Sequence, residues 1–337
     1  MRWRSLGLLG LLLALVAGAY YVMERKGTLS GADAGRLFPA EEKDVETISI
    51  RKGDALTALK REGDGWRLVE PVQATADSSE VASLLHTLLE AREERRIEEA
   101  PKSLADYGLE HPSLHLSMTL KGGKTLPALL LGDLNPNGRS VYAKRPDQPV
   151  VFLATVIVRF RSDRKPDDLR DKTLFALEPN QITQVELAGK GESISLSRAE
   201  GKGWEISKPI KARADAAVIG ELLWKIKDAR VTGFADSGPD AKRRYGLEHP
   251  DLIVELKDAG SVKRLLLKKA GDPQVGLYAI AEPRDDVVTL DAGLLTDLSK
   301  SPHDLVDRST PESRPATGDK GRQSLPTTPI PPASSSS

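Results

Sequence analysis

The stretch Tyr-Gly-Leu-Glu-His-Pro at residues 107–112 recurs without a change at residues 245–250, an offset of 138 positions. The same offset carries Gly65-Trp66 onto Gly203-Trp204. A shared register over so long a stretch indicates a tandem duplication of one module. The period is far longer than the roughly 20 to 50 residues of solenoid repeats, so two globular domains of about 130 residues each are expected.

Each module begins with segments that alternate apolar and polar residues, which is typical of half-buried strands. Residues 45–50 read Val-Glu-Thr-Ile-Ser-Ile. Residues 182–187 are their counterpart in the second module, with a less regular alternation. Polar turns containing glycine separate them from further short strands, and this order predicts a meander. The following strands are expected at residues 55–59 and 66–69 in the first module, and at 193–197 and 204–207 in the second.

The spacing of apolar residues then changes to that of a helix. Asp77 and Asp215 precede these segments and are well placed as N-caps, which accept the N–H groups that a first turn leaves unpaired. A paired catalytic aspartate is the alternative interpretation. One apolar stripe is formed by Val81, Leu84, Leu85 and Leu88, and it is matched by Ile219, Leu222, Leu223 and Ile226.

Alternating runs return after the hexapeptide in both modules. Strands followed by one principal helix and more strands predict an α+β class with a mainly antiparallel sheet in each module. Residues 163–177, which include Asp168-Leu169-Arg170-Asp171-Lys172, connect the modules. The later strands are expected at 114–120, 126–131, 141–143 and 150–153, and at 252–256, 262–267, 277–280 and 287–290.

The hexapeptide is the first candidate for a chemical site, and most of its residues suit a turn. Gly108 and Gly246 fit a position of positive φ after a helical turn, where the following leucine folds back onto the apolar core. Pro112 and Pro250 restrict the preceding histidine to extended geometry. The Glu-His pair could act as acid and base, but adjacent residues of an extended chain point to opposite sides.

Other candidate sites are weak. The chain has no cysteine, and His111 and His115 have a metal-binding spacing only on a helix, whereas their segment predicts a strand. Tryptophans repeated in both modules are interpreted as core anchors, with a ligand platform as the alternative. We expect no catalytic, cofactor-binding or metal-binding residues. The repeated positions taken as structural are Trp66, Pro71, Asp77, Tyr107, Gly108 and Pro112, and Trp204, Pro209, Asp215, Tyr245, Gly246 and Pro250.

The N-terminus has the pattern of a membrane anchor. Residues 5–23 are uncharged and largely apolar, and as a helix they cover roughly 28 Å, close to a bilayer core. Arg2 and Arg4 precede them, so the positive-inside rule places that end in the cytoplasm and the bulk of the chain in the periplasm. A cleaved signal peptide is the alternative, since Ala17-Gly18-Ala19 offers small residues.

Charge and composition limit the possible partners and indicate where the folded modules end. Lys plus Arg equals Asp plus Glu at 49 each, so nucleic-acid binding has no electrostatic warrant. The Pro- and Ser-rich end is expected to be disordered. The predicted organisation is a cytoplasmic stub and anchor at 1–26, a linker at 27–43, modules at 44–175 and 176–307, and a tail at 308–337.

Taken together, these motifs resemble a bacterial domain-of-unknown-function family, number 4340. The resemblance rests on the Gly-Trp strand, the Pro-x-x-x-x-Ala-Asp segment, the Leu-Leu helix and Tyr-Gly-Leu-x-x-Pro, and it covers residues 45–307. It implies an extracytoplasmic accessory of an export complex with gliding-motility-type ABC transporter components. The anchor, the duplication, the balanced charge and the lack of converging reactive groups lead us to expect a non-catalytic binding or scaffolding protein of the inner membrane and periplasm, with transporter subunits as partners. A periplasmic hydrolase acting on glycan or peptide, and a carrier of an apolar ligand, remain alternatives.

Overall fold

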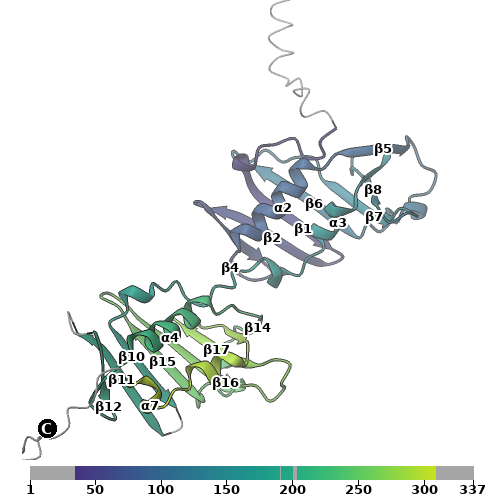
Figure 1. Ribbon diagram of the computed structural model, residues 1–337. Helices are drawn as coiled ribbons and strands as arrows, with labels where there is room; N and C mark the ends of the chain where they lie inside the picture. Colours follow the sequence, from purple (N-terminus) through teal and green to yellow (C-terminus); the bar gives the residue numbers. More distant parts are fainter. Residues whose placement is uncertain (1–34, 190, 200–202, 309–337) are drawn as a thin grey trace, which may run out of the picture.

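The computed structural model describes residues 35–189, 191–199 and 203–308 and contains two antiparallel sheets (Figure 1). Within these residues each sheet has nine strands, and the order in the second sheet repeats that of the first. The α+β class, the antiparallel sheets and the tandem architecture predicted from the sequence are thus confirmed. The hexapeptide register therefore reports a duplication of the fold as well as of the sequence.

The first sheet has the order β4-β3-β2-β1-β6-β7-β8-β9-β5, so two meanders meet where β1 pairs with β6. The polar-apolar alternation of β1 places Ile48 and Ile50 in the core. The strands are β1 (Val45–Lys52), β2 (Ala55–Glu62), β3 (Gly65–Glu70), β4 (Ala74–Thr75), β5 (Glu93–Glu98), β6 (Leu114–Leu120), β7 (Leu129–Leu134), β8 (Ser140–Lys144) and β9 (Val151–Thr155).

The second sheet repeats this arrangement as β13-β12-β11-β10-β15-β16-β17-β18-β14. Its central junction is the antiparallel pair β10 and β15. The strands are β10 (Gln184–Gly189), β11 (Glu192–Ala199), β12 (Gly203–Lys208), β13 (Ala212–Arg213), β14 (Gly233–Asp236), β15 (Leu252–Lys257), β16 (Val262–Lys269), β17 (Leu277–Glu282) and β18 (Val287–Leu290).

One principal helix crosses each sheet, α2 (Ser78–Glu90) in the first module and α4 (Ala216–Asp228) in the second. The strands before and after α2, β4 and β5, lie at opposite edges of the sheet. A 13-residue helix is about 20 Å long, so α2 lies across the sheet and covers part of one face (Figure 1). Its predicted apolar stripe is buried there, which makes this face the main core.

Several elements differ from the expectation. The charged stretch after α2 forms the edge strand β5, and β7 begins at Leu129 instead of residue 126, because Pro127 has no N–H to donate to a ladder. A second helix, α3 (Val156–Ser162), packs beside α2 over the same face. It is followed by a 3-10 turn, η3 (Pro166–Leu169), and the second module repeats both as α6 (Gly293–Leu298) and α7 (Pro302–Leu305).

The first module's core extends upstream of its first strand, because Leu37 and Phe38 are buried in it. Over the part of the chain that the structure describes, no helix has the length and apolar character needed to cross a membrane. The expected anchor at residues 5–23 and the expected tail after residue 308 fall outside the described residues.

Candidate functional site

The repeated hexapeptide closes a short helical turn in each module. Gly108 follows the 3-10 turn η2 (Ala105–Tyr107) with φ +63°, and Gly246 follows α5 (Ala241–Arg244) with φ +69°. The next residue in each copy, Leu109 or Leu247, is buried and donates its backbone N–H to a carbonyl five positions upstream. These bonds satisfy carbonyls at the end of the turn, so Gly and Leu act here through backbone geometry.

The tyrosines of the two hexapeptides hold these turns against the sheets. Tyr107 packs edge-on against Tyr142 at 5.0 Å between ring centroids, and Tyr245 packs against Tyr278 at 4.7 Å. In the second module this contact joins a small cluster around Leu266, whereas its neighbours along β16 point into the main core. The turn therefore covers the face of the sheet opposite the principal helix.

The Glu-His pairs of the hexapeptides are exposed to solvent. Glu110 and His111, like Glu248 and His249, are exposed where the chain leaves the turn. Strands β6 and β15 start two residues after Pro112 and Pro250. The structure therefore places these acids and bases at the surface of separate modules.

Asp77 and Asp215 lie at the N-caps of α2 and α4. Asp77 Oδ1 accepts the N–H groups of Ser79 and Glu80 at 2.9 and 3.1 Å. Asp215 Oδ1 accepts two in the same way, at 2.9 and 3.4 Å. One carboxylate oxygen in each module is thus engaged by the first turn of a helix.

The repeated tryptophans are buried, Trp66 with 5% and Trp204 with 6% of its surface exposed, and each belongs to its module's core. Such exposure leaves little surface for a ligand. Pro71 and Pro209, which follow the tryptophan strands, each come after a cis peptide bond.

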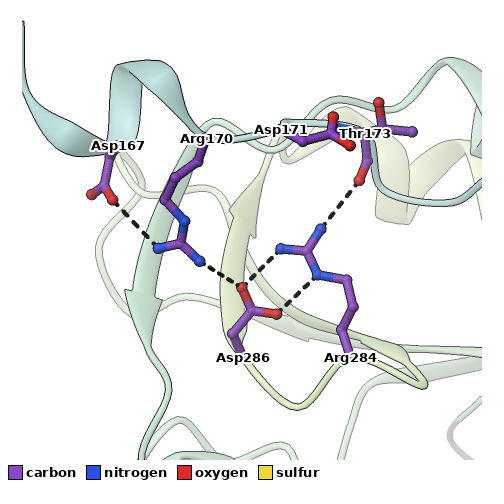
Figure 2. A network of polar contacts seen from close by, with 6 residues as sticks. All are labelled: Asp167, Arg170, Asp171, Thr173, Arg284 and Asp286. Atoms are coloured by element: carbon purple, nitrogen blue, oxygen red, sulfur yellow. Dashed lines mark hydrogen bonds and ion pairs between the residues drawn. The ribbon is translucent and has the colours of Figure 1, made fainter. Parts of the chain in front are cut away.

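The connector between the modules carries a polar cluster that the sequence did not reveal (Figure 2). Asp286 sits between two guanidinium groups: Arg170 Nη2 donates to its Oδ2 at 3.0 Å, and Arg284 donates to both its oxygens at 2.8 and 2.9 Å. Arg284 also donates to the backbone oxygen of Thr173 at 3.2 Å. The Arg170 guanidinium lies 3.4 Å from the ring centroid of Phe234.

The same connector is hydrogen-bonded to both modules. Asp171 N–H donates to the backbone oxygen of Thr75 in the first module, and Val231 N–H of the second donates to Lys172. We call the connector and this cluster the joint.

A groove of about 710 Å³ lies beside the joint. Residues of both modules line it, among them Arg67 of the first module and Lys263 of the second.

The joint shifts the acidity of its central carboxyl. Burial raises the pKa of Asp286, but hydrogen bonds from Arg284 and the charges of Arg284 and Arg170 outweigh it, so the pKa lies below its ordinary value. The same carboxylate raises the pKa of Arg284. Asp286 is therefore ionised at neutral pH and holds both cations.

Sequence reasoning missed the joint because Arg170 and Asp286 are 116 residues apart. A signal was present in the comparison of the two copies. The positions of Arg170, Phe234 and Asp286 correspond to Val306, Arg96 and Val150 in the other module. At these three positions the residues that form the joint are replaced by residues of another kind in the other copy.

Metal chemistry has no candidate in this part of the molecule. Across residues 35–189, 191–199 and 203–308, no three acidic or histidine side chains are grouped so that they could hold a metal ion.

The family model "Domain of unknown function (DUF4340)" matches residues 66–243 and 204–316. The two matches begin on Trp66 and Trp204, the equivalent tryptophans of the two modules. The chain belongs to this family. No curated protein and no solved structure matches it.

Proposed function

We propose that this chain is a non-catalytic binding or scaffolding protein, anchored in the inner membrane by residues 5–23, with its two modules in the periplasm. Its partners are subunits of a membrane transport complex of the ABC type. The apolar N-terminal segment with its preceding arginines supports the anchor and the orientation. The balanced charge of the chain supports protein partners over nucleic acid.

The joint is the observation that carries a scaffolding role. A buried carboxylate clamped by two arginines, together with backbone hydrogen bonds to both modules, gives the two modules a defined relation. A scaffold that presents two surfaces to one partner needs its modules to keep a fixed orientation relative to each other. The hydrolase alternative needs converging acids, whereas Asp77 and Asp215 cap helices and Glu110 and Glu248 are exposed in turns of separate modules.

Copurification of the full-length chain after crosslinking in membranes and mild detergent extraction tests the proposal. We expect membrane transport subunits to be recovered with it. Asp286→Asn, which disrupts the joint, should reduce their recovery, while Asp285→Asn at the exposed neighbouring position should not. A monodisperse chain with no crosslinked partner would contradict the scaffolding role.

Localisation is tested separately. The chain should stay with the membrane fraction after alkaline carbonate washing, and protease added to spheroplasts should digest both modules. Release by carbonate, or protection of the modules in intact spheroplasts, would exclude the proposed anchor or its orientation.

A further inference from the structure

A cavity in the first module lies between the sheet and the segment that follows α3. It has a volume of about 380 Å³, within the range of about 300 to 1,000 Å³ that small-molecule sites occupy. Its apolar wall consists of Ile50, Leu56 and Leu114 from β1, β2 and β6. Most of its polar wall is one continuous segment, residues 162–166, and the strands add Lys52 and Thr57.

The polar wall contains a buried hydroxyl without a partner. Ser162 has 1% of its surface exposed, and its Oγ makes no hydrogen bond to any described residue. Leaving such a group unpaired costs about 1–3 kcal/mol. Because Ser162 lines the cavity, a hydrogen-bonding atom of a molecule bound there would satisfy it.

The charges beside the hydroxyl favour an anion. Lys52 pairs with Asp163 at 2.5 Å, and Arg164 pairs with Glu80 at 3.2 Å. Lys165 is exposed, and its ammonium has no ion-pair partner among the residues described. The cavity edge therefore carries one uncompensated cation three residues from the unpaired hydroxyl.

The second module provides an internal comparison. It has a cavity of about 500 Å³ at the equivalent place, lined by Leu187, Leu252 and residues 298–301. Leu298 stands where the first module has Ser162, and Ser301 where it has Lys165. The apolar trough is common to both modules, and lysines line both cavities, Lys165 in the first and Lys269 and Lys300 in the second. The buried hydroxyl without a partner belongs, among the described residues, to the first cavity alone.

We propose that the first module binds an alkyl carboxylate in this cavity. The carboxylate accepts a hydrogen bond from Ser162 Oγ and is attracted by the charge of the Lys165 ammonium. The alkyl chain lies over Ile50, Leu56 and Leu114. A group the size of a water molecule fills about 30 Å³, so 380 Å³ holds about a dozen such groups. This corresponds to a chain of about eight to twelve carbons. The binding does not depend on any transport partner, so it can fail or succeed independently of the function proposed above.

The test uses the purified full-length chain in nanodiscs of zwitterionic lipid, because detergent tails would compete for the cavity. The probe is a ten-carbon carboxylate with a diazirine in the chain and a terminal alkyne. After illumination, saturable labelling is expected on peptides from β2 and from residues 156–166, and at most weakly on residues 292–301. Decanoate should block labelling at roughly tenfold lower concentration than decanol, since only the former accepts charge-assisted hydrogen bonds.

Three variants locate the binding. Ser162→Leu places the second module's residue in the first cavity and should lower labelling at least about tenfold. Lys165→Ser, an exposed change that leaves the core untouched, should abolish the preference for decanoate over decanol even if Ser162→Leu fails to fold. Phe160→Thr alters the same helix at a position 59% exposed, where the second module has Thr296, and should change nothing.

The proposal is overturned by any of three results: no saturable labelling, equal labelling of the two modules, or equal competition by decanoate and decanol. Unchanged labelling of a folded Ser162→Leu variant would also overturn it. In that case Ser162 Oγ is satisfied by water.

Discussion

Asp77 and Asp215 each accept two backbone N–H groups through one carboxylate oxygen, although an acid at the same position of both modules is also compatible with catalysis. A cap and a catalytic acid respond differently to substitution. Asparagine keeps a side-chain oxygen and is as good an N-cap as aspartate, whereas it cannot act as a general base.

We therefore predict that Asp77→Ala lowers the free energy of unfolding by about 1 kcal/mol and that Asp77→Asn leaves it nearly unchanged. Urea unfolding followed by Trp fluorescence measures both. Asp64→Ala, in the exposed turn between β2 and β3, is the control and should lie within about 0.5 kcal/mol of the parent chain. Equal losses for Asn and Ala at position 77 would rule out capping as the role of Asp77.

At the scale of single elements, β5 shows how a charged stretch can be a strand. It ends the sheet order beyond β9, and Glu94, Arg95 and Arg96 are exposed along it. An edge strand presents unpaired backbone groups to other chains, and charged side chains discourage that pairing.

Replacing Arg95 and Arg96 together by Val should therefore promote association through the β5 edge. We expect dimers or larger species in size-exclusion chromatography with light scattering, at concentrations where the parent chain shows none. The matched control replaces Lys60 and Glu62 of β2 by Val, because both are exposed but their strand is already paired on both sides. If both double variants associate equally, added hydrophobicity and not the free edge is the cause.

At the scale of the whole molecule, the joint decides how the two modules are held. Asp286 is 9% exposed and receives three hydrogen bonds from two arginines. Removing its charge leaves Arg170 and Arg284 without the carboxylate that they share, and hydrogen bonds to charged groups contribute about 1.5–3 kcal/mol.

Asp286→Asn should accordingly destabilise the joint by about 2 kcal/mol and speed hydrogen exchange in residues 170–175. Hydrogen exchange with mass spectrometry measures the change. Asp285→Asn removes the neighbouring exposed charge and should leave the exchange as it is. If residues 170–175 exchange as slowly in the Asp286→Asn variant as in the parent chain, the backbone hydrogen bonds of the connector hold the joint without the ion pairs.

The joint should also depend on pH in a defined direction. The pKa of Asp286 is lowered in the folded chain, compared with about 3.9 for an unperturbed aspartate. Its contribution to stability is therefore fully present above about pH 4 and is lost as the pH falls through the folded pKa.

The difference in unfolding free energy between the parent chain and Asp286→Asn isolates this contribution from that of other carboxylates. We expect it to be constant from pH 7 to about pH 5 and to shrink toward zero below about pH 4. Urea titrations at each pH give the values. A difference that shrinks on raising the pH above 7 would have the opposite sign and contradict the lowered pKa.

Much of each module was predictable because its signals are local. The alternation in residues 45–50, the four-residue apolar stripe of α2 and the glycine after Tyr107 depend on neighbours along the chain, and the structure forms β1, α2 and the turn there. The helix α3 was missed because only Val158 and Ser162 of its seven residues are buried, which is too short a pattern to recognise.

The sequence by itself determined the duplication, the α+β antiparallel class and the family, because an exact repeat and short-range periodicity survive in the order of residues. Only the tertiary structure decided that Arg170 meets Asp286 across 116 residues and that Ser162 loses its hydrogen-bond partners beside an apolar trough. Both depend on distant segments coming together. The repeated hexapeptide reports how each module is built. The joint and the cavity hydroxyl instead involve positions at which the two copies differ, Arg170 against Val306 and Ser162 against Leu298.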